Sequence, residues 1–267
     1  MNKTLVFGII ATVSVLMGGV SCTLFQDPMV AEGKKTYAYY CAHCHGEDGN
    51  GDGFNAANVD PKPRDHTDGG EPYMAGRTNE ELFEAVAMGG RGIGKSPIMP
   101  PWGGVLSEKE IWSLVAYMRT LHKNDKPQVV LPKDAKLERV KIPSSRKKTI
   151  EIPVEMGEDG ITPVDPEVVK AKLVRTGERL FEKKFGCNGC HAIGGVGGQV
   201  GPPLSRAGFR LKDTYIFNWL KNPQAIKPDT KMPNFLLRDQ DALAITLYLK
   251  TLRAAPEGPP AGKDEKT

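Results

Sequence analysis

Two short segments of the chain each bring two cysteines and a histidine together at one spacing. They read Cys41-Ala42-His43-Cys44-His45 and Cys187-Asn188-Gly189-Cys190-His191. Two thiols three positions apart can form thioethers with the two vinyl groups on one edge of a porphyrin, and the next residue then presents its imidazole to the iron. The sequence therefore predicts two covalently bound haem c groups. The predicted attachment residues are Cys41, Cys44, Cys187 and Cys190, and the predicted iron ligands that follow them are His45 and His191.

Other uses of paired cysteines explain these segments less well. A thioredoxin-like dithiol would need a strand that leads into a helix, and neither segment has that context. Four cysteines could hold zinc, but the histidine after each second cysteine would then have no role. Haem attachment accounts for all six residues together.

The sixth ligand of the second haem can be predicted because few residues of the right type follow His191. After His191 the chain has no further histidine and a single methionine, Met232, within Lys231-Met232-Pro233. Methionine is a strong haem ligand, and Met232 lies 41 residues after His191, far enough for the chain to cross to the other face of the haem. The sequence therefore predicts Met232 as the second ligand of this iron.

The first half of the chain offers a wider choice of sixth ligand. The candidates are Met74, Met88, Met99, Met118, His66 and His122. Met99 shares its Met-Pro context with Met232, and each Met-Pro site precedes an amphipathic helix. Met88 and Met118 fall in helical runs, where core packing is the simpler role, and His122 is expected at a solvated helix end. We predict Met99, with His66 as the remaining alternative.

The two halves form a divergent internal repeat. Gly33 lies four residues before Tyr37 ahead of the first motif, and Gly177 lies four residues before Phe181 ahead of the second. Each half predicts a first helix, a haem segment, a long loop, a short helix, a Met-Pro loop and a final helix. We expect each glycine to let the first helix cross closely over the last one, against an aromatic ring. Capping-box patterns at 78–81 and 107–110 predict two helix starts.

On these motifs both halves resemble class I cytochrome c domains, an all-helical fold with His/Met-ligated haem. The resemblance covers roughly residues 27–123 and 166–254, and it implies an all-α protein of two tandem domains. In that family a Gly-Pro-x-Leu loop holds the proximal histidine through a backbone carbonyl. Gly201-Pro202-Pro203-Leu204 matches this loop, and Pro61-Lys62-Pro63-Arg64 is a looser counterpart. The resemblance therefore implies that Pro202 supports His191 and that Pro63 supports His45.

The N-terminus predicts export. A weakly basic start and an apolar stretch at 5–20 lead to small residues before Cys22, which resembles the lipobox of bacterial lipoproteins. We expect residues 1–21 to be a signal peptide and Cys22 to be lipidated, which would hold the protein on the periplasmic side of a bacterial membrane. An ordinary cleavage site and a short uncleaved anchor are the alternatives.

A long charged linker, 124–165, is predicted between the domains, and a Pro/Gly-rich disordered tail, 255–267, after them. From 123 to 148 the chain has nine Lys/Arg against three Asp/Glu. Alternating residues at 137–142 and 149–152 predict short β segments or an extended chain. Such a linker is either a docking surface for an acidic partner or a solvated tether.

Ligation on both faces of the iron indicates electron transfer, with no catalytic residue. The formal net charge of +4 does not fit a nucleic-acid binder. The expected partners are a protein electron donor and acceptor, with the chain as a tethered carrier or a cytochrome subunit of a membrane respiratory complex. A dihaem peroxidase has two such motifs too, but it needs one five-coordinate haem, and a Met-Pro site in each half argues against it. A haem-based sensor would need a signalling domain, and no segment is left for one.

Overall fold

The computed structural model describes residues 27–69, 73–122, 128–142 and 146–254. The predicted signal peptide, Cys22 and the C-terminal tail lie outside the described residues. Within them the regular structure is helical, and the only strand-like pairing is two isolated β-bridges, Met156 with Pro163 and Ile193 with Val196. The all-α prediction is therefore confirmed, and the described part of the linker forms no strand. None of the described helices is long and apolar enough to cross a membrane.

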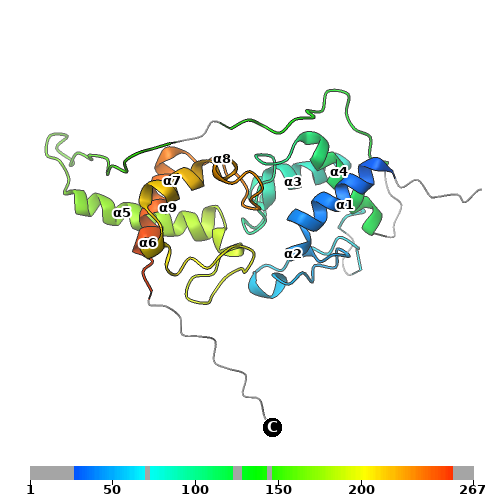
Figure 1. The fold of residues 1–267 in the computed structure, drawn as a ribbon, viewed down its shortest axis with the longest axis horizontal. Coiled ribbons are helices and arrows are strands. Elements are labelled where there is room, and N and C mark those ends of the chain that lie inside the picture. Colours follow the sequence, from blue (N-terminus) through cyan, green and yellow to red (C-terminus); the bar gives the residue numbers. More distant parts are fainter. Residues whose placement is uncertain (1–26, 70–72, 123–127, 143–145, 255–267) are drawn as a thin grey trace, which may run out of the picture.

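Domain 1 is built on two crossing helices, its first and its last, and on a third helix that leads to the Met99 loop. Its elements are α1 (Pro28–Tyr40), α2 (Ala42–His45), the 3-10 turn η1 (Ala56–Asn58), α3 (Asn79–Gly92) and α4 (Glu108–Leu121) (Figure 1). Both predicted capping boxes form, with Thr78 paired to Glu81 before α3 and Ser107 paired to Glu110 before α4. The apolar faces of these helices bury a core that includes Tyr37, Trp102 and Leu114.

Domain 2 repeats this order on the other side of the molecule. Its elements are α5 (Pro166–Arg179), the π-helical turn η2 (Leu180–Lys184), the 3-10 turn η3 (Cys187–Gly189), α6 (Ala207–Arg210), α7 (Asp213–Lys221), α8 (Pro223–Ile226) and α9 (Asp239–Thr251) (Figure 1). Its core includes Phe181, Phe217 and Ile245. The predicted order of elements is thus present in both halves.

The close crossing of the first and last helices occurs in both domains at the predicted glycines. A Cβ atom on Gly33 would overlap the carbonyl oxygen of Ser113 in α4, and one on Gly177 would overlap that of Ala244 in α9. Each missing Cβ would also lie 2.9 Å from the Cβ of an aromatic residue, Tyr117 or Tyr248. Because the obstacle is rigid backbone, only glycine fits at this crossing.

Gly33→Ala is expected to lower the free energy of unfolding of the haem-loaded protein by about 2 kcal/mol or more, the upper part of the range for overpacking. Denaturant unfolding monitored by far-UV circular dichroism measures this change. Gly76→Ala is the matched control in the same domain, since a Cβ there would meet its nearest atom at 3.7 Å, an ordinary contact. Equal stability of the two variants would contradict the crossing geometry.

The described linker residues form an extended strap, here residues 128–142 and 146–152, that runs along both domains (Figure 1). Val129 and Leu131 pack against the core of domain 1, and Ile150 packs against that of domain 2. Backbone groups of Lys147 exchange two hydrogen bonds with the Asn218 amide, at 2.9 and 3.0 Å. The strap therefore contacts both domains through these residues, while most of its other described side chains are exposed.

An ion pair ties the strap to the start of α4. The Arg139 guanidinium donates to both carboxylate oxygens of Glu110, at 2.6 Å (Nη2 to Oε1) and 3.0 Å (Nε to Oε2). Burial by itself would raise the pKa of Glu110, but the hydrogen bonds from Arg139 and Ser107 outweigh it and lower the pKa. This carboxylate therefore stays charged in the folded protein under mildly acidic conditions.

Arg139→Ala is expected to cost about 1 kcal/mol of unfolding free energy at pH 7, since the pair is bidentate and partly exposed. The folded pKa of Glu110 is below its unfolded value, so the contribution is present above about pH 4.3 and disappears as the pH falls through the folded pKa. Denaturant unfolding at pH 7 and at a series of lower pH values measures this convergence. Lys141→Ala removes a nearby exposed charge and is expected to change stability little; a gap that did not narrow as the pH falls would contradict the pair.

Candidate haem sites

The second Cys-x-x-Cys-His segment lines a cavity of about 480 Å³ in domain 2. Cys187 begins the turn η3, and backbone hydrogen bonds from Cys190 and His191 to the Cys187 carbonyl hold the segment in a compact coil. Aromatic and aliphatic side chains supply much of the remaining wall. They include Phe181, Leu204, Leu211, Ile216, Leu220 and Phe235. A mostly apolar cavity of this size, with a few polar groups, is typical of a cofactor site.

His191 is oriented by the loop that the sequence singled out. Its Nδ1 lies 2.8 Å from the carbonyl oxygen of Pro202, so Nδ1 carries the proton and Nε2 is left free to bind a metal. The ring packs on Gly201, where a Cβ would lie 2.7 Å from His191 Nδ1. Burial lowers the pKa of His191, against the opposing effect of the Pro202 carbonyl. The imidazole is therefore neutral, which is the form that binds iron.

Met232 lines the same cavity as His191, Cys187 and Cys190. The Trp219 indole N–H lies 2.8 Å from its sulfur, and the Gln224 amide donates to its backbone carbonyl at 2.7 Å. The structure thus brings together the four residues that the sequence nominated in this half. Two thiols, a neutral imidazole and a thioether around an apolar cavity fit a covalently attached haem c.

The first segment has the same histidine support with a shift of one residue. His45 Nδ1 lies 2.9 Å from the carbonyl oxygen of Arg64, whereas the sequence nominated Pro63. The Pro63 carbonyl instead lies close to Gly51, where a Cβ would be 2.8 Å from it. The loop here is the looser of the two family matches, so its register could not be read from the motif alone.

His66 does not lie opposite His45. The two rings stack, with centroids 4.2 Å apart and an interplanar angle of 17°, and His66 Nδ1 pairs with the Tyr37 hydroxyl at 3.2 Å. Two axial ligands of one iron approach it end-on from opposite faces of the porphyrin. Two imidazoles stacked face to face cannot bind one iron from opposite sides, so this geometry does not support His66 as the sixth ligand.

The Met99 loop is fastened to the end of α3. Gly89 kinks that helix with a φ of 68°, and the backbone N–H of Gly90 then donates to the Met99 carbonyl at 2.9 Å. The Trp102 N–H donates to the Val86 carbonyl at 3.0 Å and closes the loop on its other side. Sequence reasoning missed this kink, although the pair Gly89-Gly90 within a helical pattern was a signal for it.

The structure also places the other candidates for the sixth ligand of the first haem. Met118 is buried in the core, as expected, and so is Met74. Met88 is 52% exposed, so the prediction that it packs in the core was wrong. His122 is buried at 1% exposure, so the prediction of a solvated helix end was wrong as well. Met99 packs half-buried against the core of domain 1 and stays the proposed ligand.

The other uses of the cysteines gain no support. Burial raises the pKa of Cys41, Cys187 and Cys190 to about 12 each, with a smaller contribution from a neighbouring cysteine. Thiols of this kind stay protonated and are poor dithiol redox centres. Among the described residues, which include all four of these cysteines, no group of three or more Cys, His, Asp or Glu is placed to hold a metal ion.

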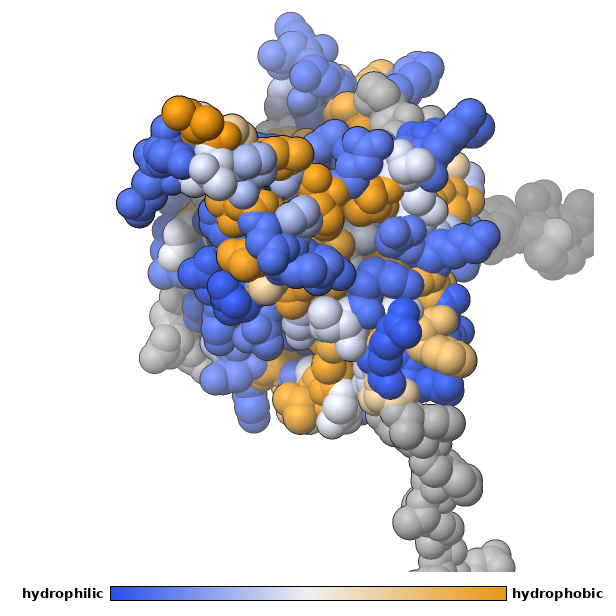
Figure 2. Space-filling view, turned by 90° about the vertical axis from the view of Figure 1, so that its left-hand side faces the viewer, coloured by the Kyte–Doolittle hydropathy of each residue, from blue (hydrophilic) through white to orange (hydrophobic). Residues whose placement is uncertain are grey.

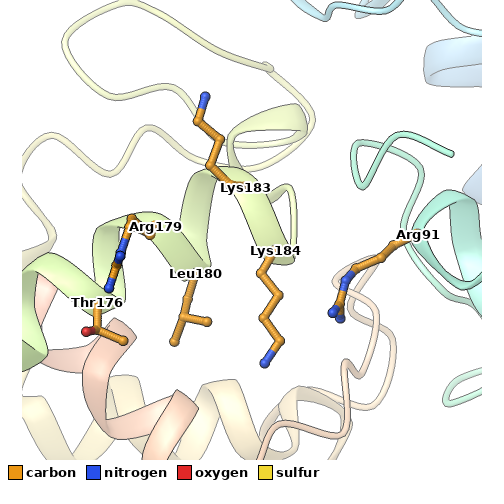
Figure 3. Close-up of a pocket in the computed structure, with 6 residues that line it drawn as sticks. All are labelled: Arg91, Thr176, Arg179, Leu180, Lys183 and Lys184. Atoms are coloured by element: carbon orange, nitrogen blue, oxygen red, sulfur yellow. The ribbon is translucent and has the colours of Figure 1, made fainter. Parts of the chain in front are cut away.

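A basic groove of about 370 Å³ is lined by Arg91 of domain 1 and by residues at the end of α5 and in η2 (Figure 3). Arg91 extends from domain 1 toward Lys184 of η2, while Arg179 and Lys183 contribute from the same stretch of domain 2. Lys184 also forms an ion pair with Asp241 at 3.2 Å. On the face at the α5 end of the molecule, hydrophobic residues are interspersed among hydrophilic ones (Figure 2).

Comparison with known families places a cytochrome domain at each half. The family model described as cytochrome c oxidase, cbb3-type, subunit III matches residues 28–118, and the model described as cytochrome c matches residues 174–253. The matched stretches contain the first and second Cys-x-x-Cys-His segments respectively.

Individual relatives are more distant. The chain is 31% identical over 90 residues to cytochrome c oxidase subunit 2 of Alkalihalophilus pseudofirmus, a match that covers 30% of this chain and 26% of that protein. The chain thus spans about a quarter of that relative's length. A chain of the reducing HAO-like protein complex of Kuenenia stuttgartiensis has 20% sequence identity and a TM-score of 0.30, over 84% of this chain and 96% of that one. From the two family matches and the repeated helical order, this protein consists of two cytochrome c-type domains in tandem, the organisation of a dihaem class I cytochrome c.

Proposed function

We propose that this chain is a dihaem c-type electron carrier that passes single electrons between a protein donor and a protein acceptor. The observation that carries the proposal is the convergence of Cys187, Cys190, His191 and Met232 on one apolar cavity. The cytochrome c-type matches at both halves support the same role for the first segment. The proposed attachment residues are Cys41, Cys44, Cys187 and Cys190, and the proposed axial ligands are His45, Met99, His191 and Met232.

Haem c supplies reversible one-electron chemistry between ferric and ferrous iron. The chain contributes binding, orientation and exclusion of water. The Pro202 and Arg64 carbonyls fix the rings of His191 and His45 and raise their basicity as ligands. Trp219 holds the Met232 thioether at the cavity, and a methionine ligand raises the reduction potential relative to a second histidine. The apolar lining of domain 2 disfavours the more highly charged ferric form.

We further propose that the chain is exported, with residues 1–21 as a signal peptide and Cys22 as a lipidated anchor. It would then act on the periplasmic side of a bacterial membrane, as a tethered carrier or as a cytochrome subunit of a respiratory complex. The matches to a cbb3-type subunit III model and to an oxidase subunit 2 favour a respiratory complex as the partner. The basic groove around Arg91 and Lys183 suits a partner with an acidic surface.

The test is a visible absorption spectrum of the haem-loaded protein, oxidised and reduced. Electron transfer predicts two haems per chain and a weak far-red band, which reports methionine–iron bonding, at full intensity for both. A high-spin signature in one haem would mean an open iron. It would overturn the carrier proposal in favour of peroxide reduction, the other function that two Cys-x-x-Cys-His segments can serve.

A further inference from the structure

The two haem-attachment segments meet at one buried side chain, Asn55. This residue lies just before η1 in domain 1 and is 0% exposed. Its amide nitrogen lies 2.8 Å from the carbonyl oxygen of Gly189, which stands between the two cysteines of the second segment, and 3.3 Å from the Cys44 sulfur of the first segment. Its amide oxygen accepts from the backbone N–H of Gln199 at 2.8 Å.

Two of these three partners belong to the other domain. If the domains separated, the Gly189 carbonyl and the Gln199 N–H would lose their partner, and so would the Asn55 amide. Unpaired polar groups of this kind are costly wherever they stay buried, about 1–3 kcal/mol each. The amide makes all three of these hydrogen bonds only in the docked arrangement, which makes it a specific contact between the domains.

Other contacts join the second segment to the Met99 loop of domain 1. A Cβ on Gly189 would lie 2.9 Å from the Ile98 side chain, and one on Gly186 would overlap the Pro97 carbonyl. Ile98 and Pro100, on either side of Met99, line the cavity of domain 2. The loop that carries the proposed ligand of the first haem is thus part of the wall of the second haem site.

A second hydrogen bond between the domains is more exposed to solvent. The Tyr39 hydroxyl donates to the Asp229 carbonyl at 2.7 Å, and Lys231 Nζ lies 4.5 Å from the centroid of the Tyr39 ring. Tyr39 is 39% exposed, whereas Asn55 is fully buried. It therefore serves as a comparison for Asn55, since it also joins the domains but bonds to the loop before Met232 rather than to the second attachment segment.

We propose that Asn55 is a positioning residue that locks the two haem-attachment segments together, so that the Cys44 thioether faces the second segment and the two haem sites behave as one coupled unit. This inference rests on the proposed electron-carrier function and deepens it. A coupled unit would exchange electrons internally at a rate set by the docked geometry, and an undocked chain would not.

The test compares Asn55→Leu, which keeps similar volume but no hydrogen bond, with Asn58→Ala and Tyr39→Phe in the haem-loaded protein. Opening of the domains is measured by the rate of limited proteolysis within the strap, which follows the population of open chains. Coupling is measured by magnetic interaction between the two ferric irons in electron paramagnetic resonance. We expect Asn55→Leu to raise the cleavage rate about tenfold, the equivalent of roughly 1.4 kcal/mol, and to weaken the magnetic interaction.

Asn58 lies three residues away and has no bond to the other domain, so Asn58→Ala is expected to match the wild type. Tyr39→Phe is expected to change cleavage by less than Asn55→Leu. The inference is overturned if Asn55→Leu matches Asn58→Ala in both readouts, or if Tyr39→Phe has the same effect as Asn55→Leu. Should Asn55→Leu fail to load haem, Asn55→Asp keeps the acceptor for Gln199, removes both donated bonds and must show the same opening.

Failure of this inference differs from failure of the proposed function. Cleavage of the strap reports domain docking whether or not the chain carries electrons. An open iron in the wild-type spectrum would refute the carrier proposal and leave the cleavage contrast intact. Normal spectra with no contrast between Asn55→Leu and its controls would refute the locking role alone.

Discussion

Met232→His is expected to lower the reduction potential of one haem by a few tenths of a volt, within the range of about 0.8 V that axial ligands set. Met232 lines the cavity that holds His191, so the new imidazole would face the same iron. Histidine in place of methionine favours the ferric state. A potentiometric titration followed by visible absorption measures the change, which should leave the other haem near its original potential and remove half of the far-red band.

The matched control is Met88→His, because Met88 is 52% exposed and is not among the residues that line the cavity of domain 2. It is expected to leave both potentials and the far-red band unchanged. An unshifted potential in Met232→His, with the band intact, would show that Met232 is not a ligand.

Met99→His extends the same test to domain 1. If Met99 binds the first iron, this variant lowers the other potential, and combining it with Met232→His lowers both. His66→Leu should then leave the far-red band at full intensity, because His66 stacks beside His45 rather than opposite it. A band for only one haem in the wild type, left unchanged by Met99→His, together with a high-spin haem in His66→Leu, would assign the first site to His66.

Replacing Cys187 and Cys190 together by serine is expected to reduce covalent haem from two groups per chain to one. Serine offers no thiol for the thioether bonds, while the segment at Cys41 and Cys44 keeps its own. The apolar cavity of domain 2 would then be left without its covalent occupant, so this domain should unfold at lower denaturant concentration than domain 1. Mass spectrometry of the intact chain counts the haems directly.

Cys22→Ser is the matched control for the cysteine double variant. It is expected to keep both haems and, if Cys22 is lipidated, to release the protein from the membrane fraction. The reciprocal variant, with Cys41 and Cys44 replaced by serine, should retain only the haem of domain 2. Two haems in either double variant would refute covalent attachment at those pairs.

Local sequence patterns were sufficient wherever a contact is made within a few residues or by one motif. The capping boxes at Thr78 and Ser107 depend on side chains three residues apart, and both form as predicted. The support of His191 by Pro202 lies within a motif whose spacing is kept in this chain. Gly33 and Gly177 could be read because the repeat places each at the same distance from an aromatic residue, and close helix crossing requires a residue without a Cβ.

The sequence by itself thus determined the all-helical class, the repeated order of elements and the residues available to attach and ligate haem. Only the tertiary structure decided which carbonyl supports His45, how His66 lies, where the strap runs and what Asn55 joins. These features depend on atoms brought together from distant parts of the chain; Asn55 and Gly189 are 134 residues apart. No local pattern encodes such a contact, because its free energy exists only after both domains have folded and excluded water from the surface between them.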